Sequence, residues 1–108
     1  PGWTATGARM IGCALEGDRL AAASMMAELA GAGVTRVLCE GGGALAASLI
    51  RARLVDELVI FSAGKLIGAD GRAGLGALGL QHLTDASMFE LAGLHRAGAD
   101  ICQTWRRR

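Results

Sequence analysis

Residues 37–49 have the sequence VLCEGGGALAASL, and this stretch decides the predicted fold. The run Thr35–Cys39 is too continuous in its apolar part for a half-exposed strand, so it predicts a strand buried in a parallel sheet. Glu40-Gly41-Gly42-Gly43 interrupts the run, and Ala44–Arg53 carries apolar residues four positions apart, which predicts a helix. A buried strand, a glycine turn and a helix in this order are typical of an α/β fold.

The preceding residues extend the same pattern. Ala8–Leu15 predicts a short strand, and Glu16-Gly17-Asp18 predicts a turn. Leu20–Ala30 is rich in Ala, Leu and Met, which are strong helix formers, and Asp18 is predicted to cap that helix. A left-handed residue commonly ends such a helix, and the sequence offers Gly31 and Gly33.

The following residues predict a third strand, a loop and a hairpin. Leu58–Phe61 is another buried strand, so the order strand, helix, strand, helix, strand indicates a mainly parallel sheet with helices on its faces. Gly64–Gly79 holds six glycines with little periodicity and is expected to be a functional or mobile surface loop. Phe89–Ala97 and Ile101–Trp105, joined by Gly98-Ala99-Asp100, predict an antiparallel strand pair.

Composition restricts the class of protein. The chain has 108 residues, of which 52% are hydrophobic and 19% charged, so it is too apolar for disorder and fits one small domain or part of a larger one. The net charge of +1 gives no argument for a nucleic acid or a membrane as partner. No apolar run approaches the ~20 residues of a membrane span. Arg106–Arg108 is expected to be a solvated tail.

The cysteines and histidines predict neither a redox motif nor a metal site. Cys13, Cys39 and Cys102 match no zinc or redox spacing. Cys13 and Cys39 lie in apolar runs and are expected in the core of a protein from a reducing, cytoplasmic compartment. His82 and His95 are too few and too separated for metal binding, and His95 is expected to be partly buried in a strand.

The glycine turn is the main chemical signal. The first amides of a helix lack internal partners and lie at the positive end of its dipole, and glycines let a phosphate approach the backbone. Residues 41–46 also satisfy the dinucleotide pattern G-x-G-x-x-A. However, Asp56 and Glu57 precede the next strand, which is unlike the standard dinucleotide unit. A tight turn with close packing of the helix therefore remains open as an alternative to phosphate binding.

Three other side chains are weighed in the same way. Glu40 ends a predicted strand, where its carboxylate is placed either to bind a ligand or to cap the following helix. Lys65 and Arg72 lie in or beside the glycine-rich loop, and a solvated position is expected for both.

Four motifs in order resemble one family. They are Val37–Leu49, Leu54–Leu58 (LVDEL), Lys65–Gly68 (KLIG) and Leu83–Ala86 (LTDA). Together they resemble the riboflavin-biosynthesis pyrimidine reductases, which form the C-terminal domain of the bifunctional deaminase–reductase. The resemblance runs from about residue 8 to residue 105.

The resemblance implies a dihydrofolate-reductase-like fold with three αβα layers. The implied reaction uses NADPH to reduce the ribosyl group of 5-amino-6-(5-phosphoribosylamino)uracil to ribityl, and the hydride chemistry belongs to the cofactor. Glu40 corresponds to a substrate contact, and no catalytic residue is assigned. The nucleotide-binding turn and helix start would comprise Gly42, Gly43, Ala44, Leu45, Ala46, Ala47 and Ser48.

The chain also departs from the family pattern. Gly64 stands where the family usually has Pro, and the family's upstream strand, its Ser-Leu-Asp-Gly segment and its deaminase domain are missing. Residues 1–108 are therefore expected to be the C-terminal part of a single reductase domain, without turnover alone. Family reductases tend to dimerise, so a homodimer is expected. The alternatives are a non-catalytic oligomerising fragment and a generic nucleotide- or phosphate-binding α/β module.

Overall fold

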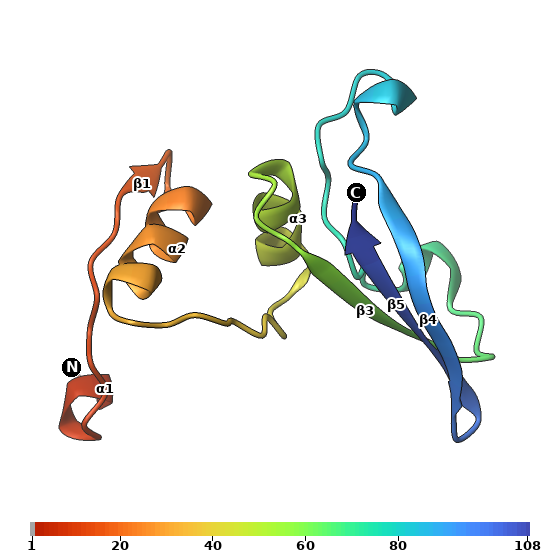
Figure 1. The fold of residues 1–108 in the computed structure, drawn as a ribbon, viewed down its shortest axis with the longest axis horizontal. Helices are drawn as coiled ribbons and strands as arrows, with labels where there is room; N and C mark the ends of the chain where they lie inside the picture. Colours follow the sequence, from red (N-terminus) through yellow and green to blue (C-terminus); the bar gives the residue numbers. More distant parts are fainter. Residues whose placement is uncertain (1) are drawn as a thin grey trace. The chain divides into compact units, whose positions relative to one another are not determined.

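The computed structural model describes residues 2–108, and the chain divides into two compact units. The first unit ends at Glu40, and the second spans Gly41–Arg108. Figure 1 shows the helices and strands of each unit. No helix within the described residues is long and apolar enough to cross a membrane.

The first unit contains two helices and a very short hairpin. Its elements are α1 (Gly2–Ala5), β1 (Leu15–Glu16), β2 (Arg19–Leu20) and α2 (Ala22–Gly31). The strands β1 and β2 pair in antiparallel orientation around a turn whose Gly17 has a φ of +64°. The predicted turn at residues 16–18 and the predicted helix Leu20–Ala30, which corresponds to α2, are therefore confirmed.

The end of α2 is a Schellman motif. The amide of Gly33 donates to the carbonyl of Ala30 at 2.9 Å, and the amide of Val34 donates to that of Leu29 at 3.0 Å. Gly33 has a φ of +91°, a conformation that a glycine adopts without steric cost. The prediction that a glycine ends this helix is confirmed at Gly33.

The cap predicted for α2 is wrong. The helix begins after Ala21, and no side chain caps its first turn. Strand β2 lies between Asp18 and the helix, so the carboxylate of Asp18 belongs to the hairpin turn instead.

The two strands predicted early in the chain are also wrong for the most part. Of the stretch Ala8–Leu15 only Leu15 is in a strand, and Thr35–Cys39 has no regular structure. Leu38 is 80% exposed, and Cys39 is exposed rather than in the core. A strand needs a neighbour to accept its backbone hydrogen bonds, and no described residue pairs with either stretch in the way predicted.

The second unit combines one helix with a three-stranded sheet (Figure 1). The elements are α3 (Gly43–Arg51), β3 (Glu57–Ser62), the 3-10 turns η1 (Gly68–Asp70) and η2 (Leu83–Asp85), β4 (Phe89–Ala97) and β5 (Asp100–Arg107). The helix and the C-terminal hairpin agree with the predictions, and the glycine-rich loop is irregular apart from η1. The hairpin turns at Gly98-Ala99, where Gly98 has a φ of +64° as the first residue of a two-residue turn.

The sheet has the order β3-β5-β4, and every strand pair among residues 2–108 is antiparallel. The parallel pairing expected for Leu58–Phe61 is therefore wrong, as is its burial, since Phe61 is 65% exposed. Strand β3 lies at an edge of the sheet and has one neighbour among the described strands, β5. His95 on β4 is likewise exposed rather than partly buried.

One face of this sheet is apolar and largely open to solvent. Residues opposite one another on paired strands point to the same face, so Leu58, Trp105 and Leu91 share it. By the same rule Ile60 and Leu94 lie on this face, and Leu94 is 61% exposed. The term apolar face is used below for the residues Leu58, Ile60, Leu91, Leu94, Ile101 and Trp105, among which Gln103 is the polar partner of Ile60 and Leu94.

The buried core is small. Among the described residues, the buried hydrophobic side chains are Ala22, Ala47, Leu49, Ile50 and Cys102. Three of these five lie on α3, which makes that helix the best-buried element of the second unit. The site described below is built on α3.

The C-terminal arginines do not form a free tail. Arg106 pairs with Glu57 at 3.2 Å across β5 and β3, and Arg107 pairs with Asp56 at 2.8 Å. These arginines are exposed to solvent, as predicted, but the prediction of a tail is wrong because β5 runs through to Arg107 as the central strand. Asp56 and Glu57, which do not follow the dinucleotide pattern, thus have a role as partners of these cations.

Candidate functional site

The glycine turn places α3 with unpaired amides at its start. Gly42 is the N-cap, and its carbonyl accepts hydrogen bonds from Leu45 at 3.1 Å and Ala46 at 3.2 Å. Within residues 2–108, the amides of Gly43 and Ala44 have no acceptor, and no side chain caps the helix. These two amides are the unpaired donors expected at the start of a helix, at the positive end of its dipole.

Gly42 and Gly43 do not have equivalent surroundings. A Cβ atom on Gly42 would meet nothing within 4 Å, whereas one on Gly43 would lie 2.8 Å from the carbonyl oxygen of Ala73. The amide of Gly76 also donates to the carbonyl of Gly43 at 2.9 Å. Gly43 therefore serves close packing, against a loop rather than a sheet, while Gly42 leaves the approach to the helix start open.

Glu40 does not cap α3. It is exposed, lies outside any helix or strand, and ends the first unit. Among the described residues, its carboxylate takes part in no hydrogen bond or ion pair. Of its two predicted roles, the capping role is not found.

The remaining residues predicted to bind the cofactor lie along α3 and differ in their exposure to solvent. Ala44 and Leu45 are exposed, Ala46 is half-buried, and Ala47 is only 2% exposed. A ligand at the helix start meets the backbone of its first residues, whereas the side chain of Ala47 packs inside the unit.

Ser48 is engaged within the helix. Its hydroxyl donates to the carbonyl of Ala44 at 3.1 Å and accepts a hydrogen bond from Arg51 Nη2 at 3.1 Å. Arg51 Nη1 in turn donates to the carbonyl of Ala77 at 2.9 Å. Sequence reasoning missed Arg51, because a solvent-facing arginine on a helix carries no signal of its partner.

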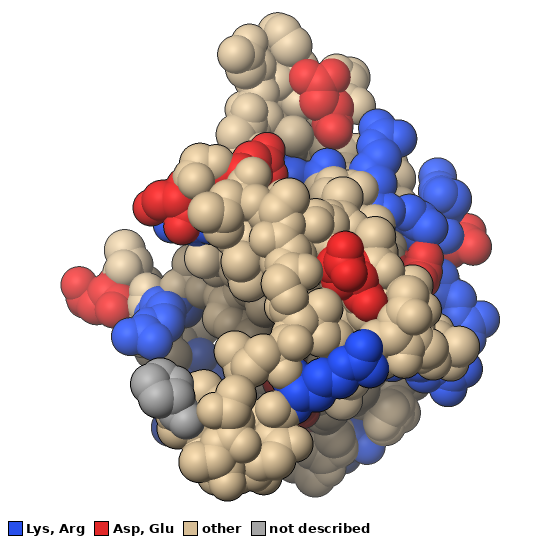
Figure 2. Space-filling model, turned by 90° about the vertical axis from the view of Figure 1, so that its left-hand side faces the viewer, with Lys and Arg blue, Asp and Glu red and all other residues tan. Residues whose placement is uncertain are grey.

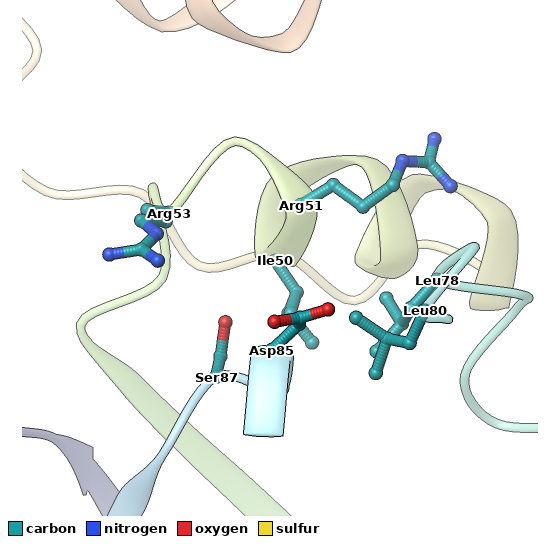
Figure 3. A pocket seen from close by; sticks show the side chains of 7 residues that line it. All are labelled: Ile50, Arg51, Arg53, Leu78, Leu80, Asp85 and Ser87. Carbon is teal, nitrogen blue, oxygen red and sulfur yellow. The ribbon is translucent and has the colours of Figure 1, made fainter. Parts of the chain in front are cut away.

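A cavity of about 280 Å³ lies at the opposite end of α3. Figure 3 shows Ile50, Leu78 and Leu80 lining it together with the carboxylate of Asp85. Arg51 and Arg53 point to opposite sides in this view, and Ser87 completes the lining (Figure 3). The cavity was not predicted, although Asp85 belongs to the LTDA motif.

Arg53 is the one non-glycine residue with positive φ in the described part of the chain, at +56°. It occupies the position in α3 that Gly33 occupies in α2: its amide bonds to Ile50 at 2.9 Å, and that of Leu54 bonds to Leu49 at 3.0 Å. Arg107 donates to the carbonyl of Arg53, so the strained corner is tied to β5.

The described charged side chains outside this region do not gather into a second binding site. Lys65 and Arg72 are exposed, as predicted. Within the described residues, no cluster of three His, Cys, Asp or Glu side chains is placed to hold a metal ion. On the face shown in Figure 2, acidic and basic side chains are interspersed with uncharged surface.

Comparison with known proteins shows the family to which the chain belongs. The sequence model of the family described as "RibD C-terminal domain" matches residues 5–102. The chain belongs to this family. The riboflavin-biosynthesis resemblance stated from the four motifs is thereby confirmed.

Individual relatives agree with the family match. The chain is 36% identical over 78 residues to riboflavin biosynthesis protein RibD of Escherichia coli, covering 72% of this chain and 21% of that protein. It is 38% identical over 81 residues to RibD of Haemophilus influenzae, covering 75% and 22%. It is 31% identical over 78 residues to the 2,5-diamino-6-ribosylamino-4(3H)-pyrimidinone 5′-phosphate reductase of Methanothermobacter thermautotrophicus, covering 71% and 36%.

The solved structures support the fold. RibD of Acinetobacter baumannii superimposes with a TM-score of 0.69 at 21% identity, covering 79% of this chain and 24% of that one. The chain is therefore an α/β chain of the RibD reductase type, from the family of riboflavin-biosynthesis pyrimidine reductases. It spans about a fifth of the RibD relatives and about a third of the archaeal reductase.

Proposed function

We propose that this chain supplies the cofactor-binding turn of an NADPH-dependent reductase that acts on 5-amino-6-(5-phosphoribosylamino)uracil. One observation carries the proposal: the start of α3 presents the unpaired amides of Gly43 and Ala44 beside the open position of Gly42. Such an end favours a phosphate, because its donors lack partners and the helix dipole adds positive potential.

The residues present fit a nicotinamide dinucleotide phosphate in one respect. The amides of Gly43 and Ala44 would hold a phosphate oxygen, and the absent Cβ of Gly42 leaves room for it. When bound, NADPH supplies the hydride. The carboxylate of Glu40 is free to accept a hydrogen bond from a substrate hydroxyl or amide.

The remainder of the site lies beyond these residues in this proposal. The dihydrofolate-reductase-like three-layer fold places parallel strands beside a turn of this kind, and Thr35–Cys39 is the stretch that would join them. Its exposed apolar residues are consistent with such a place, since Val37 is 44% and Leu38 80% exposed. We therefore propose that residues 1–108 act as part of one cytoplasmic reductase domain and do not turn over substrate alone.

A chimera tests the functional proposal. The 78 residues of this chain that align with the Escherichia coli relative replace the matching segment there, and reductase activity and NADPH affinity are measured. Activity in the chimera is expected if the chain carries a working cofactor turn. A folded chimera that binds no NADPH would refute the proposal.

A pair of variants at Gly42 tests the turn itself, because this position has open space and an ordinary φ of −68°. Gly42→Asp and Gly42→Asn add side chains of equal size that both cap helices well. Only the aspartate repels a phosphate, so it should weaken NADPH binding by a further tenfold or more compared with asparagine. Equal affinities in a fluorescence titration would contradict phosphate binding at this turn. Tight binding of AMP or ADP as well as NADPH would favour the generic nucleotide-binding module.

A second candidate role is assembly into a homodimer. It is favoured by the apolar face of the sheet, on which Leu91 is 52% and Leu94 61% exposed. A contiguous exposed apolar surface of this kind commonly marks a contact with another chain. Light scattering should show a dimer, and Leu94→Glu should dissociate it. A stable monomer at micromolar concentration would rule out this role.

A further inference from the structure

The loop segment 73–77 is fastened to α3 through two residues of the helix, one in its first turn and one in its last. At the first turn, the amide of Gly76 donates to the carbonyl of Gly43 at 2.9 Å. A Cβ atom on Gly76 would lie 3.0 Å from that same oxygen, so the two backbones are in direct contact. At the last turn, Arg51 reaches the carbonyl of Ala77 at 2.9 Å. The segment predicted to be functional or mobile is thus anchored to the helix.

The anchor at the last turn depends on a pair of side chains. Arg51 uses Nη1 for Ala77 and Nη2 for the hydroxyl of Ser48. The guanidinium is planar and rigid, so two hydrogen bonds in its plane fix its direction. The hydroxyl proton of Ser48 is itself directed to the carbonyl of Ala44. Ser48 therefore acts through Arg51.

The contact at the first turn sets the direction of a proposed cofactor donor. The carbonyl of Gly43 and the amide of Ala44 belong to one planar peptide unit and point in opposite directions. A hydrogen bond from Gly76 to that carbonyl therefore orients the N–H of Ala44. The same bond polarises the peptide unit and strengthens its N–H as a donor.

We infer that Arg51, held by Ser48, is a positioning residue that keeps residues 73–77 against the first turn of α3 and thereby sets the affinity for NADPH. The inference rests on the proposed function. In this inference Ser48 does not contact the cofactor; it holds Arg51 in position. Because the loop is already anchored, less conformational entropy is lost when the cofactor binds. This is the general basis of preorganisation.

The test compares Arg51→Met with Arg51→Lys and with the control Arg96→Met. Methionine keeps the aliphatic part of the side chain but donates no hydrogen bond. Lysine keeps an ammonium donor but lacks the planar guanidinium that donates to two acceptors at once. Arg96 is also exposed and, within the described residues, has no hydrogen bond or ion pair. Two quantities are measured in the chimera: hydrogen exchange of the Gly76 amide by NMR, and the Kd for NADPH.

The variants are expected to differ in how strongly they change hydrogen exchange and the Kd for NADPH. Arg51→Met should speed exchange of the Gly76 amide by about tenfold and raise the Kd roughly three- to tenfold, in keeping with one lost charge-assisted hydrogen bond. Arg51→Lys should fall between Arg51→Met and the unmodified protein, and Arg96→Met should change neither quantity. Ser48→Ala should act in the same direction more weakly, and it serves as the second variant if Arg51→Met does not fold.

The outcomes separate the two proposals. Unchanged exchange at Gly76 in Arg51→Met would overturn the positioning role. Faster exchange with an unchanged Kd would overturn the link to the cofactor while leaving the proposed function intact. A failure of the unmodified chimera to bind NADPH would instead refute the proposed function, and the inference about affinity with it.

Discussion

Replacing Arg53 by glycine is expected to stabilise this protein, although it removes a charged side chain from the end of a helix. Arg53 has a φ of +56°, and the left-handed conformation costs a residue with a Cβ atom roughly 1–2 kcal/mol. Glycine avoids that cost but loses about 0.5–1 kcal/mol through the greater freedom of the unfolded chain. Compared with Arg53→Ala, which also lacks the charge, the net gain is about 0.5–1 kcal/mol.

The measurement is thermal unfolding followed by circular dichroism. A gain of this size raises the Tm of a domain of about 100 residues by roughly 2–8 °C. The control is Arg53→Ala, which removes the same side chain but keeps the Cβ atom and hence the strain. The backbone carbonyl that accepts from Arg107 is retained in both variants.

The comparison of the two variants decides the matter. If Arg53→Gly is no more stable than Arg53→Ala, the strain is not relieved and the reasoning is refuted. The mirror experiment in α2 is Gly33→Ala, where a Cβ atom is introduced at a φ of +91°. It should lower the free energy of unfolding by about 1 kcal/mol.

Two further predictions concern packing and exposure. Gly43→Ala should lower the free energy of unfolding by roughly 1–3 kcal/mol in urea titrations, because its Cβ would lie 2.8 Å from a backbone oxygen, whereas Gly42→Ala should change little. An equal effect at both positions would show that the loop contact at Gly43 is not maintained. Cys39 should react with a thiol reagent in the native protein and Cys102 only on unfolding, because the first is exposed and the second buried; equal rates under native conditions would contradict this.

The correctly predicted elements are those whose signal is local. The helix that became α3 was recognised from its apolar spacing, and the hairpin around Gly98 from two strand patterns and a turn. The left-handed Gly33 follows from glycine's lack of a Cβ atom. Each of these depends on neighbours within a few residues, which the sequence displays directly.

The errors concern partners that are distant in the sequence. Thr35–Cys39 has the composition of a buried strand, but no described strand pairs with it. Likewise, the apolar residues of β3 gave no sign that their neighbour would be antiparallel and more than 40 residues later. A run of apolar residues specifies a preference for burial and leaves the choice of partner to the rest of the fold.

For the candidate site, the sequence predicts the helix start with its unpaired amides but not the contacts that hold it in place. The amides at the start of α3 follow from the position of the glycines before a helix. Two contacts depend instead on how the loop that contains η1 returns to the helix. They are the contact between Gly43 and Gly76 and the hydrogen bond from Arg51 to Ala77. Arg53 was missed because arginine has no preference for a left-handed conformation.

The strand order β3-β5-β4 has a consequence for how this sheet forms. The central strand is the last of the three in the sequence, so neither outer strand has a neighbour until β5 is available. Strands β4 and β5 are joined by two residues and can pair locally, whereas β3 must wait through the glycine-rich loop and η2. During synthesis, the apolar residues of β3 therefore stay without a strand partner longest, and this is the interval in which the growing chain is most exposed to mispairing.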